Sequence, residues 1–522
     1  MPDSGISRRR ALQLLAGAGA LAAVGGCDSD TTPTTVTTIP PVTDTTITSP
    51  VLEPDVRDLH VGLWAEPSTA SIQAGVTTEV FSYGARVIEG DVASVVDSGS
   101  YLGPTLHLRQ GQRVRVTFEN RLDQESIVHW HGLVVPQDQD GQPAEAIPPG
   151  ETYEYDFVVE NRPGTYWYHP HPHHLTGSQV YQGLAGLLVI HGEEGSLADT
   201  VNDLALVLQD RTIDPDGQLR YVAMMHDVMA GFVGETLVTN GVAGYEAVVR
   251  PEPYRIRILN GANSRTQYLT WSTGDQLHAV ATDGALLPKT ISVDGLVITP
   301  AQRTDLWMDF SQFQPGDRIE LLTADMFIES AGMMGGGMGG GGSDDFGLNL
   351  IPQTAASFIV GETTPVHGEM PTAPGFDPTF GAEDAVNADA PKEFVLSTRR
   401  AAHWINGTQW EGRSVTELET VKAGTVELWD FVNFSPMPHP MHLHGMAFRV
   451  VSRTWEDDGL AEAWSGIEDG VIESGVRDTV LVWPGQRVQI AVPFAEHKGF
   501  FPYHCHILEH EDGGMMRNFL VI

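Results

Sequence analysis

Residues 106–116 read LHLRQGQRVRV, and their apolar and polar residues alternate on both sides of a glycine turn. Alternation with a period of two is typical of a β-strand that has one face in the core. The second half of the stretch continues as RVRVTFEN to Asn120, and it is echoed by YRIRILNG around Asn260 and by TVELWDFVN ending at Asn433. The stretch therefore predicts a strand-based unit that occurs three times along the chain.

Two more echoes join the outer units. Pro149-Gly150-Glu151 and Pro484-Gly485-Gln486 each precede an alternating strand, and GTYWYHPH (164–171) is matched by GFFPYHCH (499–506). The middle unit has a corresponding strand, PAQRTDLWMDF from Pro300, but no histidine cluster. Short alternating strands separated by Gly and Pro turns indicate β-sandwiches.

We therefore predict an all-β chain with three sandwich units and one connector. The predicted units cover residues 51–202, 203–355 and 390–522, with a Pro-, Thr-, Ala- and Gly-rich linker over 356–389. The length of 522 residues is sufficient for three domains of roughly 150 residues each.

The charge and cysteine content exclude some classes of protein. The chain has 30 Lys and Arg against 68 Asp and Glu, a formal charge of -38. Such a surface repels phosphate, which argues against a nucleic-acid partner or an anionic membrane surface. The 2 cysteines are too few for a disulfide framework.

The N-terminus predicts export. Residues 7–13 read SRRRALQ and lead into an apolar run that ends at Gly26 and is too short to span a bilayer. The paired arginines resemble a twin-arginine signal, although Ala11 stands where that motif usually has Phe. Val24-Gly25-Gly26-Cys27 resembles a lipobox, so Cys27 is expected to be lipidated; ordinary cleavage that discards it is the alternative.

The next segment is expected to be a tether. Residues 28–50 are nearly all Thr, Pro, Asp, Ser, Val and Ile without an apolar period, a composition that cannot form a core. No later stretch reads as a membrane span. We therefore expect a periplasmic or cell-surface protein whose membrane contact is limited to the lipid anchor.

Histidines form four clusters at corresponding ends of the first and third units. A single His-X-His pair is weak evidence for a metal, but four such clusters at matching places predict a metal centre. The clusters are His129-Trp130-His131-Gly132, His169-Pro170-His171, His439-Pro-Met-His442-Leu-His444-Gly445, and His504-Cys505-His506 followed by His510 and Met515.

Strand geometry predicts two kinds of metal site around Cys505. Residues two apart point to one face, so His504 and His506 can reach one metal cluster while Cys505 faces a separate metal. A thiolate, two imidazoles and a weak thioether are typical of a blue electron-transfer copper, here Cys505, His439, His510 and the axial Met515. Structural zinc is the alternative metal, but it needs one closed set of four ligands and leaves most of these histidines unexplained.

The four motifs, in this order, resemble those of the multicopper oxidases over essentially all of residues 51–522. The resemblance implies three cupredoxin-like domains, four coppers per chain and a trinuclear copper cluster between the first and last domains. It implies that His129 and His442 are ligands of the type 2 copper. It implies the type 3 ligands His131, His169, His171, His444, His504 and His506.

The resemblance also implies an enzyme. Electrons taken singly from a substrate would pass through Cys505 and its histidine neighbours and reduce dioxygen to two waters. Asp140 and Glu511 match acidic residues that relay protons in the family; the alternative is that both are ordinary acids in an acid-rich chain. A copper-sequestration protein without turnover is the alternative from another class, and a copper nitrite reductase is disfavoured because the paired histidines imply a trinuclear site.

The substrate is expected to be Cu(I) or a phenol. The segment MFIESAGMMGGGMGGGG (326–342) combines glycines with methionines whose soft thioethers prefer Cu(I); an exposed insertion with incidental methionines is the alternative. These methionines are Met326, Met333, Met334 and Met338.

Three other stretches increase the resemblance to the bacterial copper efflux oxidases, which oxidise Cu(I) in copper homeostasis. They are TGSQVYQGLAG (176–186), LVTNG (237–241) and IRILNGANSR (256–265). Met437 matches a methionine of their substrate-copper site, but Ser435 stands where they have an aspartate. That departure keeps a laccase-like phenol oxidase as the alternative.

Overall fold

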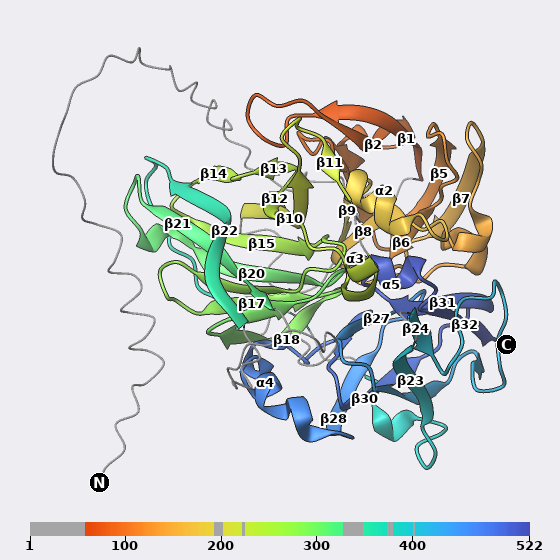
Figure 1. The fold of residues 1–522 in the computed structure, drawn as a ribbon. Coiled ribbons are helices and arrows are strands. Elements are labelled where there is room, and N and C mark those ends of the chain that lie inside the picture. Colours follow the sequence, from red (N-terminus) through yellow and green to blue (C-terminus); the bar gives the residue numbers. More distant parts are fainter. Residues whose placement is uncertain are drawn as a thin grey trace, which may run out of the picture. The chain divides into compact units, whose positions relative to one another are not determined.

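The structure of the chain is a computed structural model that describes residues 58–192, 202–221, 225–326, 348–372, 375, 379–399 and 402–522. The predicted export signal, the tether and most of the methionine-rich segment lie outside these residues. Strands dominate the described residues, and the helices are few and short (Figure 1). The predicted all-β fold of three consecutive cupredoxin-like sandwiches is confirmed, whereas the proposed domain boundaries stay a prediction.

The first domain consists of a sheet in the order β2-β1-β5-β7 and a second in the order β3-β4-β9-β8-β6. The glycine turn of LHLRQGQRVRV carries the chain from one sheet to the other, with Gly111 at a φ of 83°. The elements are β1 (Leu59–Ala70), β2 (Thr78–Glu89), β3 (Val95–Val96), β4 (Gly103–Arg109), β5 (Arg113–Asn120), β6 (Val128–His131), β7 (Thr152–Val158), β8 (Gly164–Pro170), α2 (Thr176–Gln182) and β9 (Gly186–His191).

The middle domain has an eight-stranded sheet in the order β13-β12-β10-β15-β20-β17-β18, with β11 paired to β10, and a five-stranded sheet in the order β14-β22-β21-β16-β19. Its elements are β10 (Asn202–Ile213), β11 (Leu219–Arg220), α3 (Met225–Ala230), β12 (Thr236–Thr239), β13 (Val242–Ala243), β14 (Glu246–Val249), β15 (Pro253–Asn260), β16 (Gln267–Trp271), β17 (Leu277–Thr282), β18 (Ala285–Val293), β19 (Leu296–Ile298), β20 (Arg303–Asp309), β21 (Arg318–Met326) and β22 (Leu348–Val360).

The third domain has two five-stranded sheets, in the orders β24-β23-β26-β30-β28 and β25-β32-β31-β27-β29. Its elements are β23 (Lys392–Arg399), β24 (Ala402–Ile405), β25 (Thr420–Val421), β26 (Val426–Asn433), β27 (His439–Leu443), β28 (Arg449–Trp455), α4 (Ala461–Ser465), β29 (Thr479–Val482), β30 (Gln486–Pro493), β31 (Gly499–Cys505), α5 (Leu508–Asp512) and β32 (Met516–Val521).

The echoed sequences occupy the same place in each domain. Strands β5, β15 and β26 each pair in parallel with an early strand of their own domain, namely β1, β10 and β23. On its other side each pairs antiparallel with the strand of the second echo, namely β7, β20 and β30. The repeated sequence therefore marks a repeated strand pair.

The asparagine that ends each echo makes the same kind of buried hydrogen bonds in all three domains. The Asn120, Asn260 and Asn433 side chains are fully buried. In the third domain Asn433 Nδ2 donates to the carbonyls of Met437 (2.7 Å) and Val482 (2.9 Å), and Asn120 and Asn260 bridge two carbonyls in the same way. Because a buried carbonyl needs a donor, this amide holds the chain that leaves the strand.

Each domain has an apolar core between its two sheets. Phe118 is fully buried in the first domain, Phe358 in the middle domain and Phe431 in the third. These rigid sandwiches present the ends of their strands as fixed supports for the histidine clusters.

Candidate metal centre

Two pairs of neighbouring strands carry most of the clustered histidines. In the first domain β6 pairs with β8, which places His129 opposite His169. In the third domain β27 pairs with β31, which places His442 opposite His504. Since residues two apart share a face of a strand, each pair of strands directs several imidazoles to one side.

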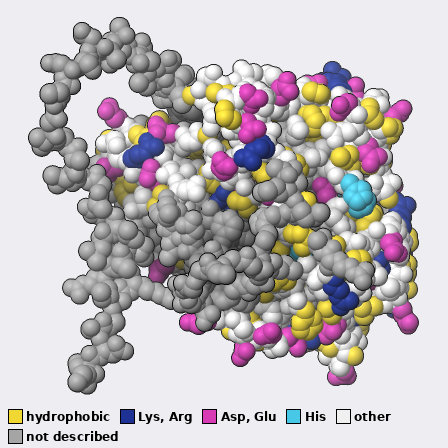
Figure 2. Space-filling view, viewed as in Figure 1, with side chains coloured by type: hydrophobic (Ala, Val, Ile, Leu, Met, Phe, Trp, Pro, Cys, Tyr) yellow, Lys and Arg dark blue, Asp and Glu magenta, His cyan; other side chains and the backbone are white. Residues whose placement is uncertain are grey.

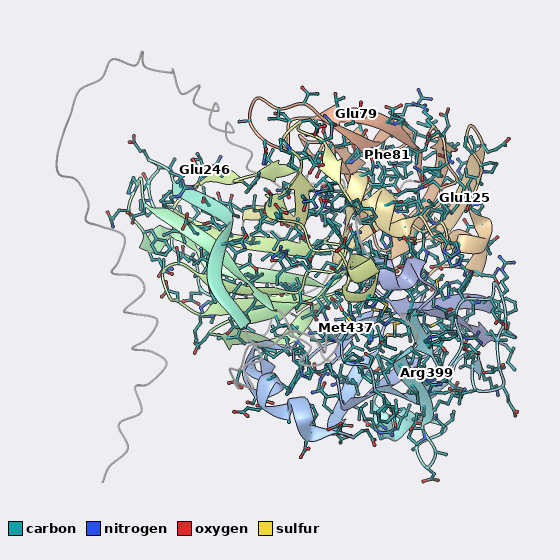
Figure 3. All side chains as sticks on the ribbon, in the orientation of Figure 1. Glu79, Phe81, Glu125, Glu246, Arg399 and Met437 are labelled. Carbon is teal, nitrogen blue, oxygen red and sulfur yellow. The ribbon has the colours of Figure 1, made fainter. Side chains whose placement is uncertain are left out.

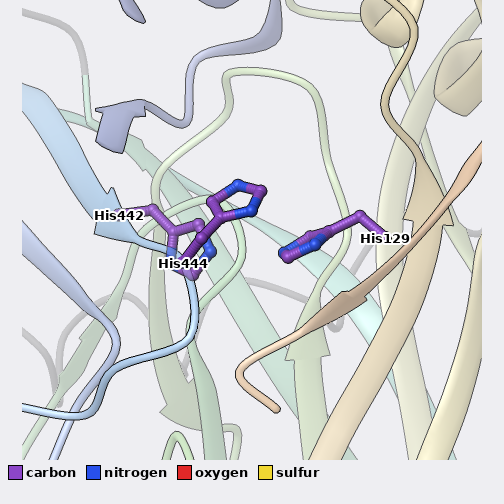
Figure 4. Close-up of side chains that lie close together, drawn as sticks. All are labelled: His129, His442 and His444. Carbon is purple, nitrogen blue, oxygen red and sulfur yellow. The ribbon is translucent and has the colours of Figure 1, made fainter. Parts of the chain in front are cut away.

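The two strand pairs meet between the first and third domains. The ring of His129 stacks on that of His444, and the ring of His131 stacks on that of His442, each with centroids 3.8 Å apart. Figure 4 shows His129 approaching His442 and His444 from the other domain. The structure thus brings together all the residues that we predicted for the trinuclear cluster. Each is at most 1% exposed: His129, His131, His169, His171, His442, His444, His504 and His506.

The free ring nitrogens of this histidine group fit a metal. Nδ1 of His129 donates to the Asp140 carbonyl and Nδ1 of His442 to the Asp478 carbonyl, each at 2.8 Å. The opposite Nε2 atoms of both rings are buried without a hydrogen-bond partner. Burial lowers the pKa of both imidazoles, so they are neutral, which is the form that binds a metal. A buried lone pair facing other lone pairs is what a bound metal ion would satisfy.

The potential ligand atoms also lie close enough together to share metals. The candidate donor atoms of His129, His442 and His444 all lie within 4.8 Å of one another. The same holds for the group His171, His444 and His504, and for His129, His131 and His169.

A second group of side chains surrounds Cys505, on the other face of β31. Its Sγ lies 3.4 Å from Nδ1 of His439 and 3.5 Å from Nδ1 of His510, and all three side chains are fully buried. Met515 is also fully buried, and its carbonyl accepts a hydrogen bond from the Cys505 amide at 3.1 Å. Burial raises the pKa of the Cys505 thiol, so a bound cation would be needed to stabilise the thiolate.

In both histidines of this group, the Nε2 atom that faces away from Cys505 has a polar partner. Nε2 of His439 lies 2.6 Å from Ser435 Oγ, and Nε2 of His510 lies 3.1 Å from the carbonyl of Met229, in α3 of the middle domain. Such bonds orient each ring with Nδ1 toward Cys505. Met437 is half-buried in the segment that leads into β27 (Figure 3), and its carbonyl accepts from Ser435 Oγ at 3.0 Å.

His403 belongs to this second group and was missed by the sequence reasoning. Its ring lies on that of His510 with centroids 3.7 Å apart, and its Nε2 lies 3.1 Å from the same Met229 carbonyl. No histidine neighbours it within the sequence AHWI of β24. The contact arises only from tertiary packing, so no local signal could have identified it.

Both predicted acidic residues lie against the trinuclear group. Asp140 Oδ2 is 2.7 Å from Nδ1 of His444, and Glu511 Oε2 is 3.2 Å from Nδ1 of His504. Burial, and then Glu145, raise the pKa of Asp140 well above its usual range. Burial also acts to raise the pKa of Glu511, but the neighbouring histidines outweigh it and place that pKa at about 2. The two acids thus contact the same group in different electrostatic settings.

Most of the methionine-rich segment lies outside the described residues. Met333, Met334 and Met338 lie outside the described residues, and of Met326 only the backbone, at the end of β21, is described. Its suggested role stays a prediction.

Acidic side chains outnumber basic ones on the visible surface (Figure 2). Asp and Glu side chains are scattered over the face in Figure 2, with fewer Lys and Arg among them. Among the described residues, no helix is both long and apolar enough to cross a bilayer.

Profiles of known families match both histidine-bearing parts of the chain. Residues 83–195 match one profile described as "Multicopper oxidase", and residues 385–522 match another with the same description.

Whole-chain comparisons agree. The "Multicopper oxidase mco" of Staphylococcus aureus is 30% identical over 429 residues, covering 80% of this chain and 82% of that protein. The "Laccase" of Bacillus subtilis (strain 168) is 28% identical over 480 residues, covering 80% of this chain and 88% of that protein. The crystal structure of the McoA multicopper oxidase from Aquifex aeolicus superposes with a TM-score of 0.73 at 30% identity, covering 88% of this chain and 96% of that one.

Proposed function

This chain is a member of the multicopper oxidase family, and from that premise we propose which of its residues bind copper and what it oxidises. Bound copper supplies the redox chemistry that couples one-electron oxidation of a substrate to four-electron reduction of dioxygen to water.

The proposed ligand set follows the two groups of side chains. His129 and His442 would hold the type 2 copper, and Cys505, His439, His510 and Met515 the type 1 copper. The remaining residues would hold the paired type 3 coppers: His131, His169, His171, His444, His504 and His506. The observation that carries this proposal is the pair of buried, unpartnered Nε2 atoms of His129 and His442, which converge from two domains.

Cys505 is proposed to be the catalytic link between the two groups. It is bonded in sequence to His504 and His506, which belong to the trinuclear group, while its own Sγ lies beside His439 and His510. An electron that enters at Cys505 therefore has a covalent path of one residue to either neighbouring histidine.

Asp140 and Glu511 are proposed to move protons to the oxygen-reducing site. The support is positional: each carboxylate contacts a trinuclear-group histidine, Asp140 from the first domain and Glu511 from the third. Reduction of dioxygen to water consumes protons, and a proton carrier must lie within hydrogen-bond reach of its acceptor or one water away.

We propose Cu(I) as the substrate and place its entry at Met437, beside the proposed type 1 copper. The Met437 carbonyl accepts hydrogen bonds from Asn433 Nδ2 and Ser435 Oγ. Ser435 Oγ also lies in hydrogen-bond contact with Nε2 of His439, so Met437 is connected through Ser435 to a proposed copper ligand. The methionine-rich segment 326–342 would add soft thioethers for Cu(I). The acidic surface favours approach of a cation.

A phenolic substrate is the second candidate, and Ser435 favours it. A hydroxyl in place of an aspartate removes an anionic ligand for the metal substrate at the edge of His439. The relative from Bacillus subtilis carries the name laccase.

Steady-state oxidation of Cu(I) and of a phenol panel by variants of one chain distinguishes the two. We expect Met437→Leu, which keeps the side-chain volume but removes the thioether, to raise KM for Cu(I) and to leave phenol oxidation unchanged. Deletion of residues 326–342 should lower Cu(I) oxidation while sparing or raising oxidation of bulky phenols. Equal loss for both substrates would contradict the cuprous proposal.

Export through the twin-arginine route and lipidation of Cys27 are also proposed. Arg8, Arg9 and the Val24–Cys27 motif support them. Mass spectrometry of the mature protein from the native membrane tests lipidation, because a Cys27→Ala chain should lose the acyl mass and leave the membrane fraction.

A further inference from the structure

Asp478 and Asp140 occupy equivalent places on opposite sides of the trinuclear group. The Asp140 carbonyl accepts a hydrogen bond from Nδ1 of His129, and its carboxylate lies 2.7 Å from Nδ1 of His444. The Asp478 carbonyl accepts from Nδ1 of His442, and its carboxylate lies 3.1 Å from Nε2 of His131. Both aspartates are buried: Asp140 is 0% exposed and Asp478 is 3% exposed.

Each aspartate therefore joins a histidine of its own domain to one of the other domain. The backbone of Asp140 holds His129 of the first domain, and its side chain holds His444 of the third. Asp478 does the reverse: its backbone holds His442 of the third domain, and its side chain holds His131 of the first. Because Nε2 of His131 faces this carboxylate, its Nδ1 turns toward the group and lies 3.4 Å from Nε2 of His169.

Asp478 has an ion-pair partner from the middle domain that Asp140 does not have among the described residues. Arg303, at the start of β20, places Nη1 2.9 Å from Asp478 Oδ1 and Nη2 2.5 Å from Oδ2. This guanidinium is 1% exposed. It also donates to the carbonyls of Thr165 and Asp283, at 3.1 and 2.6 Å, which fixes its plane. A bidentate pair of this kind sets both the position and the orientation of the carboxylate.

Charge balance explains why the arginine is tolerated at such depth. A buried guanidinium is costly unless it is paired and hydrogen-bonded. The Asp283 carboxylate lies 3.9 Å from Nη1 of Arg303 and 3.8 Å from Nη1 of Arg477, so two acids and two guanidinium groups share the buried region. The backbone amide of Asp478 lies 3.3 Å from Asp283 Oδ2, which ties the chain of the third domain directly to the middle domain.

We propose that Asp478 is a positioning residue of the oxygen-reducing site and that Arg303 of the middle domain holds it in place. This inference rests on the proposed ligand set, in which His131 and His442 bind copper. A fixed acceptor at the outer nitrogen of each imidazole sets its tautomer and its plane, and loss of such an acceptor typically weakens metal binding about 10- to 100-fold. The middle domain thus acts on the site although no histidine cluster of its own lies among its described residues.

Type 2 copper retention in the Asp478→Asn holoenzyme tests the proposal. Asparagine has the shape of aspartate but carries no charge. It therefore leaves the Arg303 guanidinium without its counter-charge and can offer only one oxygen acceptor to Arg303 and His131. The Asp478 carboxylate acts on both kinds of ligand, because its Oδ1 lies 3.1 Å from Nε2 of His131 and also 3.7 Å from Nδ1 of His442, the proposed type 2 ligand. We therefore expect the affinity for the type 2 copper to fall about 10- to 100-fold, measured by competition with graded chelators and by the type 2 electron paramagnetic resonance signal. The blue type 1 absorption should stay unchanged, because Cys505 contacts neither Asp478 nor Arg303 in the hydrogen bonds of the described residues.

Asp305→Asn is the matched control. Asp305 lies two residues from Arg303 in β20, is 1% exposed, and is paired with Arg255 and hydrogen-bonded to Thr165. Its substitution should lower the melting temperature and leave type 2 copper in place. Unchanged type 2 affinity in Asp478→Asn, or an equal loss in both variants, would overturn the proposal.

Arg303→Lys covers the case in which Asp478→Asn fails to fold. Lysine keeps the charge but cannot form both guanidinium contacts, so a smaller loss of type 2 copper is expected, and wild-type affinity would overturn the proposal. Failure of the ligand set itself would look different. In that case the wild-type protein would lack a type 2 signal before any variant is made.

Discussion

The ring of His129, from the first domain, lies on the ring of His444, from the third, with centroids 3.8 Å apart and an angle of 25° between the planes. Neither domain can therefore complete the proposed trinuclear site alone. A ligand that binds only the folded arrangement stabilises it by mass action.

Copper removal is thus expected to lower the stability of the whole chain. At a free copper concentration about 1,000 times the dissociation constant, one site contributes roughly 4 kcal/mol. Thermal unfolding of the holoprotein and of protein stripped by chelation under reducing conditions should differ by several degrees or more. Re-addition of copper serves as the control and should restore the transition. Identical transitions before and after stripping would contradict a copper site shared between domains.

Cys505→Ser should abolish both the blue colour and turnover. The substitution is nearly isosteric, and Cys505 is fully buried, so the fold should persist while the thiolate ligand is lost. Absorption spectroscopy and oxygen uptake measure the two effects. Cys27→Ser is the matched control, because it removes the other cysteine and should change neither. A blue and active Cys505→Ser protein would refute the type 1 assignment.

Ser435→Asp should improve Cu(I) oxidation. It places a carboxylate where Ser435 Oγ lies, 2.6 Å from Nε2 of His439, and so adds an anionic ligand beside Met437. We expect a lower KM for Cu(I), with phenol oxidation little changed, in steady-state oxygen uptake. Ser435→Asn is the control for size without charge. A gain that appears equally in both variants would argue against an electrostatic cause.

The contact between buried His107 and half-buried His191 predicts loss of stability in acid. Nδ1 of His107 lies 2.9 Å from Nε2 of His191. Burial, followed by Arg257, lowers the pKa of His107 to about 4, with Asp203 acting in the opposite direction. Burial, followed by His107 and Arg257, lowers the pKa of His191 to about 3, while Asp203 raises it and Arg109 lowers it. An unfolded histidine has a pKa of about 6.5, so the unfolded chain binds more protons below that pH.

These two histidines therefore stabilise the fold above pH 6.5, and their contribution is lost as the pH falls toward 4. One such group accounts for roughly 3 kcal/mol over that interval. Urea unfolding of the holoprotein at a series of pH values from about 4.5 to 7.5 measures the slope. The double variant His107→Phe/His191→Leu should have a shallower slope than the wild type; an equal slope would assign the acid sensitivity elsewhere.

The repeated fold and the clustered histidines were predictable because their signals are local. Alternation in LHLRQGQRVRV predicts strands, and the structure has β4 and β5 on the two sides of its glycine turn. Spacing of two in His504 and His506 predicts a shared face, and both rings lie in the buried group.

The residues that were missed depend on tertiary contacts with no local signal. Arg303 reads as an ordinary position in the strand PAQRTDLWMDF, yet it pairs with Asp478, 175 residues away. Asp478 itself directly precedes the buried TVLV of β29, where an aspartate reads as a turn residue. His403, in β24, likewise reaches His510, in α5, only through tertiary packing.

The stoichiometry of oxygen consumption tests the central claim most directly. Purified protein loaded with copper is supplied with a known number of electrons from Cu(I) or a phenol, and dioxygen uptake and peroxide are measured together. We predict one dioxygen consumed for every four electrons, with no peroxide released. One dioxygen for every two electrons, with peroxide accumulating, would contradict reduction to water at the shared histidine site.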